Sequence, residues 1–258
     1  MAVVPLTGLE DADRVRSVIE SVWGEQVLPR EMVRAFQHAG SVLYGAEAPG
    51  GDLVGFVLGF AGLSEGLHVH SHMLAAVPEW QDRGVGFALK LAQRAHCLDH
   101  GIEQVRWTFD PLVARNARFN LGKLGAEAFR LLPNFYGRMT DRLNRDDRSD
   151  RFELRWRLSS ERVGRALAGE AERPRIGEAL VARDERGMPR PTGKPPQPGA
   201  TVAVPADHHA LKGRDPAAAR AWRDAVEEAA RWCFEAGLAA VWLDRDRGYV
   251  FDLPEAAP

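Results

Sequence analysis

Cysteine is scarce in this 258-residue sequence, which contains Cys97 and Cys233 and no others. The two lie far apart in helix-like segments, so a disulfide framework and a cysteine metal site are both excluded. We expect each to be buried as a small apolar side chain. Long apolar runs are missing too, since no stretch approaches the ~18 consecutive apolar residues of a membrane helix.

The N-terminus lacks the basic start and apolar run of a secretory signal, so we expect a cytoplasmic protein without a membrane partner. Neither sign of charge dominates: 34 basic and 36 acidic residues give a formal net charge of −2. This balance argues against a nucleic-acid partner. Lysine is rare among the basic residues, and the others are arginines, whose planar fork suits carboxylates and phosphates.

The hydrophobic pattern predicts a mixed α/β (α+β) sheet, mostly antiparallel and flanked by helices. The segments 67–77 and 102–109 are expected to be strands joined by one helical crossover over 84–100. Further strands are expected at 2–7, 41–48, 53–62, 128–132 and 152–158, and further helices at 10–23, 29–40 and 114–124.

Composition changes after Leu158, which suggests a main domain over 1–160 and a C-terminal αβ extension over 161–258. Residues 183–200 are dense in proline and glycine and are expected to form a loop or linker. Behind them we expect a strand, a helix from Pro216 to Gly237 and a closing hairpin over 238–253. We expect this extension to dock on the main domain.

The segment Gln-Asp-Arg-Gly-Val-Gly at 81–86 leads from a strand end into the predicted helix. A helix N-terminus presents unpaired N–H groups, and glycine lets an anion approach them closely. Arg83 could add a charge-assisted bond to a phosphate oxygen. A dinucleotide fingerprint fits poorly, because Leu89 stands at its third glycine position, and a P-loop lacks its Gly-Lys-Ser/Thr. The plainer reading is a glycine-assisted turn.

The surrounding pattern resembles the GNAT superfamily of acyl-CoA N-acyltransferases over roughly residues 3–158. Its acyl-CoA motif matches here at Val77, Gln81, Arg83, Gly84 and Gly86, and its next helix motif matches at Asn116-Ala117 and Lys123-Leu124-Gly125. A narrower likeness, to a bacterial subgroup in part linked to N-succinylation of amino acids, rests on the motifs WTFDPL (107–112), NFYG (134–137) and SDRF (149–152).

The resemblance implies an enzyme that transfers acetyl or succinyl from acyl-CoA to a primary amine by direct attack, without a metal. The thiol arm of the coenzyme would lie between the strands 67–77 and 102–109, with a backbone N–H near Leu74 or Ala75 facing the thioester oxygen. The residues expected to contact the coenzyme are Leu74, Ala75, Ala76, Val77, Gln81, Asp82, Arg83, Gly84, Val85, Gly86, Asn116 and Lys123.

A base must take the proton of the attacking amine. His70 and His72 share a strand face with His68 and lie nearest the expected thioester, and Asp110 is the competing base. Many superfamily members protonate the thiolate with a tyrosine at a position that is Leu121 here. Tyr136 is the substitute candidate, although an aromatic packed under a turn is the more common role.

Acceptor contacts follow from chemistry alone. An amino-acid acceptor needs an arginine for its carboxylate, and Arg106 and Arg151 are the candidates, although either could be an ordinary ion pair. The acceptor is expected to be a small-molecule amine or amino acid, and edge strands are compatible with a homodimer.

Two other classes of function compete. Alternating His68, His70 and His72 could serve a metal-dependent hydrolase, but the usual aspartate position is Met73. His96 and His100 have helical spacing without the glutamate of zinc peptidases. The second alternative is a non-catalytic module that binds acyl-CoA, which the missing tyrosine favours.

Overall fold

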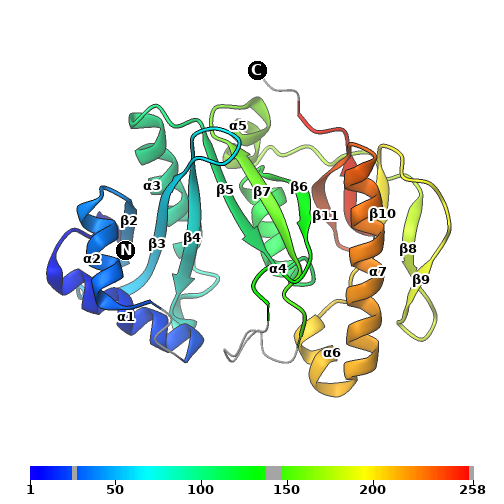
Figure 1. Ribbon diagram of the computed structural model, residues 1–258, viewed down its shortest axis with the longest axis horizontal. Helices are drawn as coiled ribbons and strands as arrows, with labels where there is room; N and C mark the ends of the chain where they lie inside the picture. Colours follow the sequence, from blue (N-terminus) through cyan, green and yellow to red (C-terminus); the bar gives the residue numbers. More distant parts are fainter. Residues whose placement is uncertain (25–27, 138–146, 256–258) are drawn as a thin grey trace. The chain divides into compact units, whose positions relative to one another are not determined.

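The computed structural model of the chain describes residues 1–24, 28–137 and 147–255. These residues form two compact units (Figure 1). The first is Met1–Trp107, and the second comprises the described residues from Thr108 onward. In the described part of the chain, no helix is long and apolar enough to cross a membrane.

The first unit is built on strands in the order β1-β2-β3-β4-β5. Neighbours are antiparallel except β4 and β5, which are parallel and joined by the crossover helix α3. The predicted mixed, mostly antiparallel sheet with one helical crossover is confirmed. The bounds are β1 Ala2–Pro5, β2 Val42–Glu47, β3 Leu53–Gly62, β4 His68–Ala76 and β5 Gln104–Phe109, whose last two residues belong to the second unit.

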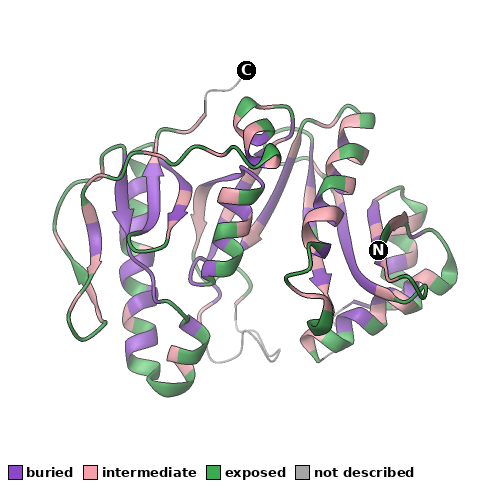
Figure 2. Ribbon diagram, turned by 180° about the vertical axis from the view of Figure 1, so that it is seen from behind, coloured by how far each residue is buried: buried purple, intermediate pink, exposed green. Residues whose placement is uncertain are grey.

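Helices cover both faces of this sheet (Figures 1 and 2). The helices α1 (Leu9–Trp23) and α2 (Arg30–His38) pack on the face that carries Phe56 and Leu58. The helix α3 (Val85–Asp99) packs on the opposite face, which carries Val57. Val57 lies between Phe56 and Leu58 in the sequence and points to the other face because side chains alternate along a strand. A short 3-10 helix, η1 (Pro78–Trp80), leads from β4 toward α3.

Gly55 of β3 allows the start of α3 to lie close to the sheet. A Cβ atom at this position would stand 2.6 Å from the carbonyl oxygen of Ala75 and 2.8 Å from Cγ1 of Val85. Both distances are shorter than real Cβ contacts, so a larger residue would push the helix start away from β4.

The second unit carries strands in the order β7-β6-β11-β12-β10-β8-β9. Its core contains large buried rings, including Trp156, Trp222 and Tyr249. Strand β11 pairs antiparallel with β6 at Ala240 and Ala128, so the C-terminal strands continue the sheet of the preceding segment. The strands are β6 Glu127–Leu132, β7 Arg151–Arg157, β8 Ala179–Arg183, β9 Pro189–Pro191, β10 Ala200–Val202, β11 Ala239–Asp244 and β12 Gly248–Asp252.

The helices of this unit depart partly from expectation. The helix expected over 114–124 splits into α4 and a π-helical turn, η2, where the Leu124 N–H donates to the carbonyl of Phe119, five residues back. The loop expected over 183–200 includes strand β9, and α5, β8 and α6 were not predicted. The helices are α4 Ala114–Ala117, η2 Arg118–Lys123, α5 Glu161–Ala168, α6 His208–Arg214 and α7 Pro216–Glu235. The domain boundary at residue 160 stays a prediction.

Candidate functional site

The pairing between strands β4 and β5 is short. They pair at Val69–Val105 and His70–Arg106, and the pairing of the first unit stops there although β4 runs on to Ala76. Half of the backbone groups of a strand point toward each neighbour. The edge of β4 between Ser71 and Ala76 therefore has no strand partner among the described residues of the first unit, and we call this edge the β4 slot.

A β-bulge lies at the start of the β4 slot. Leu58 of β3 pairs with Met73 and Gly59 pairs with Ser71, so His72 is the extra residue. The bulge resets the alternation of the strand: Ser71 faces α3, where it accepts a hydrogen bond from Lys90, whereas Met73 packs in the cluster under α1 and α2. Residues with odd numbers therefore face α3 before the bulge and face α1 and α2 directly after it, at Ser71 and Met73 respectively.

His70 and His72 share one face of β4, as the sequence predicted. Their rings lie 6.2 Å apart, and both contact Phe60, at 5.3 and 5.8 Å between centroids. Burial, followed by the charges of His72, His68 and Lys90, lowers the pKa of His70 to about 4, and burial also lowers the pKa of His72. Both imidazoles are therefore neutral at neutral pH, and His70 is a weaker base than an ordinary histidine.

Helix α3 begins at a glycine in the left-handed conformation. Gly84 is its N-cap with φ 82°, and a Cβ atom there would meet nothing within 4 Å. The first turn of α3 contains no acidic side chain. Gln81 donates to the carbonyl of Ala76 at 3.3 Å, and the Arg83 guanidinium lies over the Trp80 ring. The turn thus combines open space, a helix N-terminus and a nearby arginine, the features that suit an anion.

The remaining coenzyme candidates differ in exposure. Leu74, Ala76 and Val77 are half-buried at the end of β4 and after it, and Ala75 is buried beneath α1 and α2. In the second unit, Asn116 of α4 and Lys123 of η2 are both exposed. Leu121, which stands where the resemblance expects a tyrosine, is fully buried.

Lys90 of α3 is a functional candidate that the sequence analysis missed. Its side chain is 1% exposed, and Nζ donates to Ser71 Oγ at 2.8 Å and to Gln93 Oε1 at 2.9 Å. The same ammonium lies 3.8 Å from the centre of the Trp107 ring. Its helix face, shared with the buried Leu89 and Gln93, was the available signal, because a lysine rarely occupies such a position.

Arg106, a predicted acceptor contact, is engaged within the first unit. It is buried, it donates to Gln104, and it forms an ion pair with Glu65 at 3.1 Å. These partners give it a structural role.

Asp110, the competing base, lies in a buried charge cluster of the second unit. Arg223 of α7 donates to both of its carboxylate oxygens, at 2.7 and 3.0 Å, and also to Asp147 at 2.5 Å. His208 of α6 completes the cluster through Asp147, at 2.9 Å. Both carboxylate oxygens of Asp110 thus already accept hydrogen bonds from one guanidinium. The role of Asp110 as a competing base stays a prediction.

Tyr136 and Arg151 meet in the second unit. Tyr136 is 43% exposed, its hydroxyl lies 3.2 Å from Thr108 Oγ1, and the Arg151 guanidinium lies over its ring. Arg151 is buried and approaches Asp110 at 3.7 Å. The arrangement leaves the phenol open and holds the arginine beneath it.

The two short motifs around these residues bind each other. Ser149 accepts from the backbone N–H of Tyr136 at 3.0 Å and donates to the carbonyl of Gly137, and Asp150 accepts from the N–H of Asn134 at 2.9 Å. The NFYG and SDRF motifs thus shape one turn that presents Tyr136.

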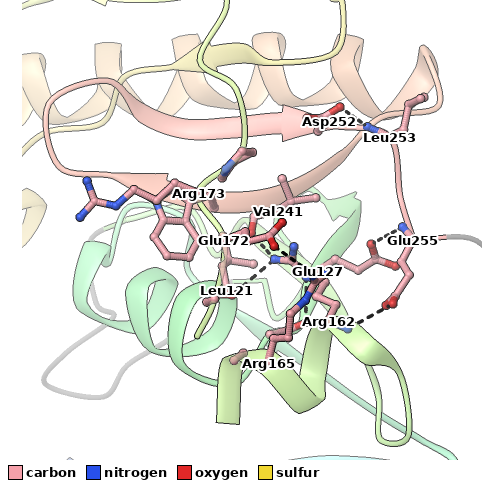
Figure 3. Close-up of a pocket in the computed structure, with 15 residues that line it drawn as sticks. Leu121, Glu127, Arg162, Arg165, Glu172, Arg173, Val241, Asp252, Leu253 and Glu255 are labelled. Atoms are coloured by element: carbon pink, nitrogen blue, oxygen red, sulfur yellow. Dashed lines mark hydrogen bonds and ion pairs between the residues drawn. The ribbon is translucent and has the colours of Figure 1, made fainter. Parts of the chain in front are cut away.

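A cavity of about 290 Å³ opens in the second unit near the C-terminal strand β12 (Figure 3). Arg162 lines it and donates to the carbonyls of Gly125, Leu121 and Val241. Buried Glu127, also on its wall, accepts from Arg155 at 2.6 Å and is paired with Arg157 at 2.9 Å. The cavity contains none of the predicted site residues, and its central charges already have partners, backbone carbonyls for Arg162 and two arginines for Glu127.

The histidines of the metal alternative lie in pairs, His70 beside His72 and His96 beside His100. Among residues 1–24, 28–137 and 147–255, no group of three or more histidine, cysteine or acidic side chains could hold a metal ion. His96 and His100 stack on each other at 4.3 Å between ring centroids.

Comparisons with known proteins identify the fold of the chain. No family model matches the chain, and no curated protein sequence matches it. Among solved structures, Naa20 from Chaetomium thermophilum, in complex with a bisubstrate analogue, is similar with a TM-score of 0.50 and 16% identity, over 67% of this chain and 92% of that one. The ribosomal-protein-S18-alanine N-acetyltransferase from Escherichia coli is similar with a TM-score of 0.50 and 16% identity, over 62% and 94%.

A GNAT-family acetyltransferase from Streptococcus pneumoniae is also similar, with a TM-score of 0.49 and 11% identity over 60% of this chain and 98% of that one. The identities are low, so the likeness concerns the arrangement of helices and strands. This arrangement agrees with the motif resemblance in the sequence. The chain has the GNAT acetyltransferase fold.

Proposed function

We propose that this protein is an acyl-CoA-dependent N-acyltransferase, which moves an acetyl or succinyl group from coenzyme A to the primary amine of a small molecule such as an amino acid. The observation that carries the proposal is the β4 slot followed by the glycine start of α3. A helix N-terminus suits the diphosphate of the coenzyme, and an unpaired strand edge offers hydrogen bonds to the amides of its thiol arm.

In this proposal, different segments of the chain bind the diphosphate and the thiol arm of the coenzyme. The backbone N–H groups of residues 81–86 hold the diphosphate, with Arg83 as an additional donor. The backbone of Leu74 to Val77 binds the thiol arm, and an N–H near Leu74 or Ala75 polarises the thioester oxygen. Exposed Asn116 and Lys123 are the proposed contacts of the second unit. Coenzyme A supplies the activated acyl group as a thioester.

Transfer proceeds by direct attack of the neutral amine on the thioester carbon. A C–N bond forms, the C–S bond breaks, and the nitrogen gives up a proton. His72 is the better base, because its side chain reaches the surface at the bulge although partial burial lowers its pKa, whereas the pKa of His70 is only about 4. His70 then orients the ring of His72 from the same strand face. Tyr136 and Arg151 are proposed to meet the acceptor.

His72→Ala is expected to lower kcat/KM by about 10²–10⁴-fold at pH 7, the range of general base catalysis. The loss shrinks at pH 9, where more of the amine is already deprotonated. Because the pKa of His72 is lowered, the imidazole itself is neutral at both pH values. Rates of thiol release measured at the two pH values check this. His209→Ala, an exposed histidine of the second unit, is the control; equal losses at both pH values for His72→Ala would assign it to packing against Phe60.

The function itself is tested in two steps. Calorimetric titration with coenzyme A measures binding, and release of free thiol from acetyl-CoA and succinyl-CoA measures turnover. The amine panel contains amino acids and a peptide that begins with alanine, since one structural neighbour is an N-acetyltransferase of a ribosomal-protein alanine. Turnover with one amine supports the proposal, and absence of coenzyme A binding rejects it.

A second candidate is a module that binds acyl-CoA without catalysis. It is favoured by buried Leu121, where the resemblance expects an acid. Tight binding of coenzyme A without thiol release on the whole panel would select this candidate.

A further inference from the structure

Lys90 lies where the pairing of β4 with β5 ends, at the start of the β4 slot. The last paired residues are His70 and Arg106, and the next residue on each strand contacts this lysine. Ser71 accepts a hydrogen bond from Nζ at 2.8 Å, and the Trp107 ring lies 3.8 Å from it. A single ammonium thus touches both strands at this end of the β4 slot.

A buried lysine needs compensation, because taking an ammonium out of water is costly. Lys90 receives it from a hydroxyl, an amide oxygen and a ring face. Gln93, which supplies the amide oxygen, is fully buried, and its Nε2 has no hydrogen-bond partner among the residues that the structure describes. An apolar residue in place of Lys90 would avoid both costs, so packing alone does not explain the lysine.

The Lys90 end of the β4 slot lies in the direction in which the proposed thiol arm runs. Six residues of extended strand separate Val77 from Ser71, which corresponds to about 20 Å at ~3.3 Å per residue. An arm anchored at residues 81–86 and extended along β4 therefore carries its sulfur toward Ser71 and Lys90. This step rests on the proposed function.

The electrostatic state of Lys90 suits proton donation. Burial lowers the pKa of Lys90 to about 7, so charged and neutral forms coexist near neutral pH. The titratable groups that interact with it include Cys97 on α3, which opposes the shift, and His70 on β4, whose own pKa the lysine lowers. Tyr44 of β2, another strand packed against α3, is engaged with His96.

We propose that Lys90, together with the Ser71 hydroxyl, stabilises and protonates the coenzyme A thiolate that leaves in the acyl transfer. As the C–N bond forms and the C–S bond breaks, the electron pair of the C–S bond goes to sulfur. A proton of the Lys90 ammonium then passes to sulfur, directly or through Ser71 Oγ, and leaves the neutral amine. The ammonium is restored by a proton from solvent after the thiol departs.

The test follows the thiol of bound coenzyme A, so it needs no acceptor. The ultraviolet absorbance of the thiolate is titrated against pH in complexes with coenzyme A, and complexes with desulfo-coenzyme A are subtracted. The protein cysteines stay silent near neutral pH, since burial raises the pKa of Cys97 to about 11 and that of Cys233 to about 12. In the wild type, we expect the thiol pKa to fall on binding by about one unit or more, a tenfold shift of its equilibrium.

Lys90→Met, which keeps an unbranched apolar chain in the core, returns the thiol pKa to its value in free coenzyme A. Ser71→Ala gives an intermediate value and serves as the second variant. Lys194→Met, an exposed lysine of the second unit, leaves the shift unchanged. An equal shift in Lys90→Met and wild type, or no shift in wild type with coenzyme A bound, overturns the proposal. Failure of the wild type to bind either coenzyme form rejects the proposed function and this inference with it.

Discussion

Gly84→Val is expected to weaken coenzyme A binding by about a hundredfold or more, equivalent to about 3 kcal/mol. Gly84 has φ 82°, a conformation that costs an L-residue roughly 1–2 kcal/mol. A β-branched side chain also occupies the open space in front of the helix N-terminus, where the diphosphate is proposed to lie. Calorimetric titration with coenzyme A measures the loss.

The opposite end of the same helix provides the control. Gly101 has φ 68°, and a Cβ atom there also meets nothing within 4 Å. Gly101→Val therefore introduces comparable backbone strain, which a thermal unfolding curve records, without touching the anion site. If Gly101→Val and Gly84→Val weakened coenzyme binding equally, strain in α3 and not the loss of the anion site would be the cause.

Arg223→Met is expected to destabilise the second unit by about 3–5 kcal/mol, the usual cost of removing one partner from a buried ion pair. Arg223 is 3% exposed and bridges Asp110 and Asp147. Its loss leaves two carboxylates in a poorly solvated site beside His208. Urea unfolding at pH 7 measures the difference. Arg220→Met, an exposed arginine on the same helix, should change stability by less than about 0.5 kcal/mol.

The penalty of Arg223→Met depends on pH in a definite direction. Burial alone raises the pKa of Asp147, but hydrogen bonds from His208 and Arg223 outweigh it and hold the pKa well below its ordinary value of 3.8. The stability from this lowered pKa is complete above 3.8 and is lost as pH falls below it. Without Arg223, protonation relieves the buried carboxylates. The gap between wild type and variant should therefore stay nearly constant from pH 7 to about pH 4 and narrow below the ordinary pKa of 3.8, and a gap that is still unchanged well below that pH would contradict this account.

The local hydrophobic pattern was sufficient to predict most elements up to residue 158, because the strands and helices there have regular periods with glycine or proline at their ends. The expected strand 53–62 is β3, and the expected helix 84–100 is α3 with one residue less at each end. The helix over 114–124 was less predictable, since its π-helical turn depends on a five-residue hydrogen bond that no side-chain period indicates. The extension was harder still, because β8 and β9 form a short hairpin within a stretch whose prolines and glycines indicated a loop.

The candidate site was predictable where backbone geometry defines it. The glycine turn at 81–86 and the shared face of His70 and His72 both follow from short-range spacing. The bulge at His72 does not, since it depends on register with β3. The ion pairs could not be predicted from the sequence either. Nothing in the spacing indicated that Arg223, 113 residues away, would donate hydrogen bonds to the carboxylate of Asp110.

Strand β9 has a consequence for how this protein behaves in concentrated solution. It ends the strand order of the second unit, and two of its three residues are Pro189 and Pro191. Proline has no N–H to offer, so a neighbouring molecule that tries to extend the sheet there finds few donors. The proline-rich segment that was expected to be a loop thus ends the sheet, and we expect it to offer few hydrogen bonds for growth by another molecule.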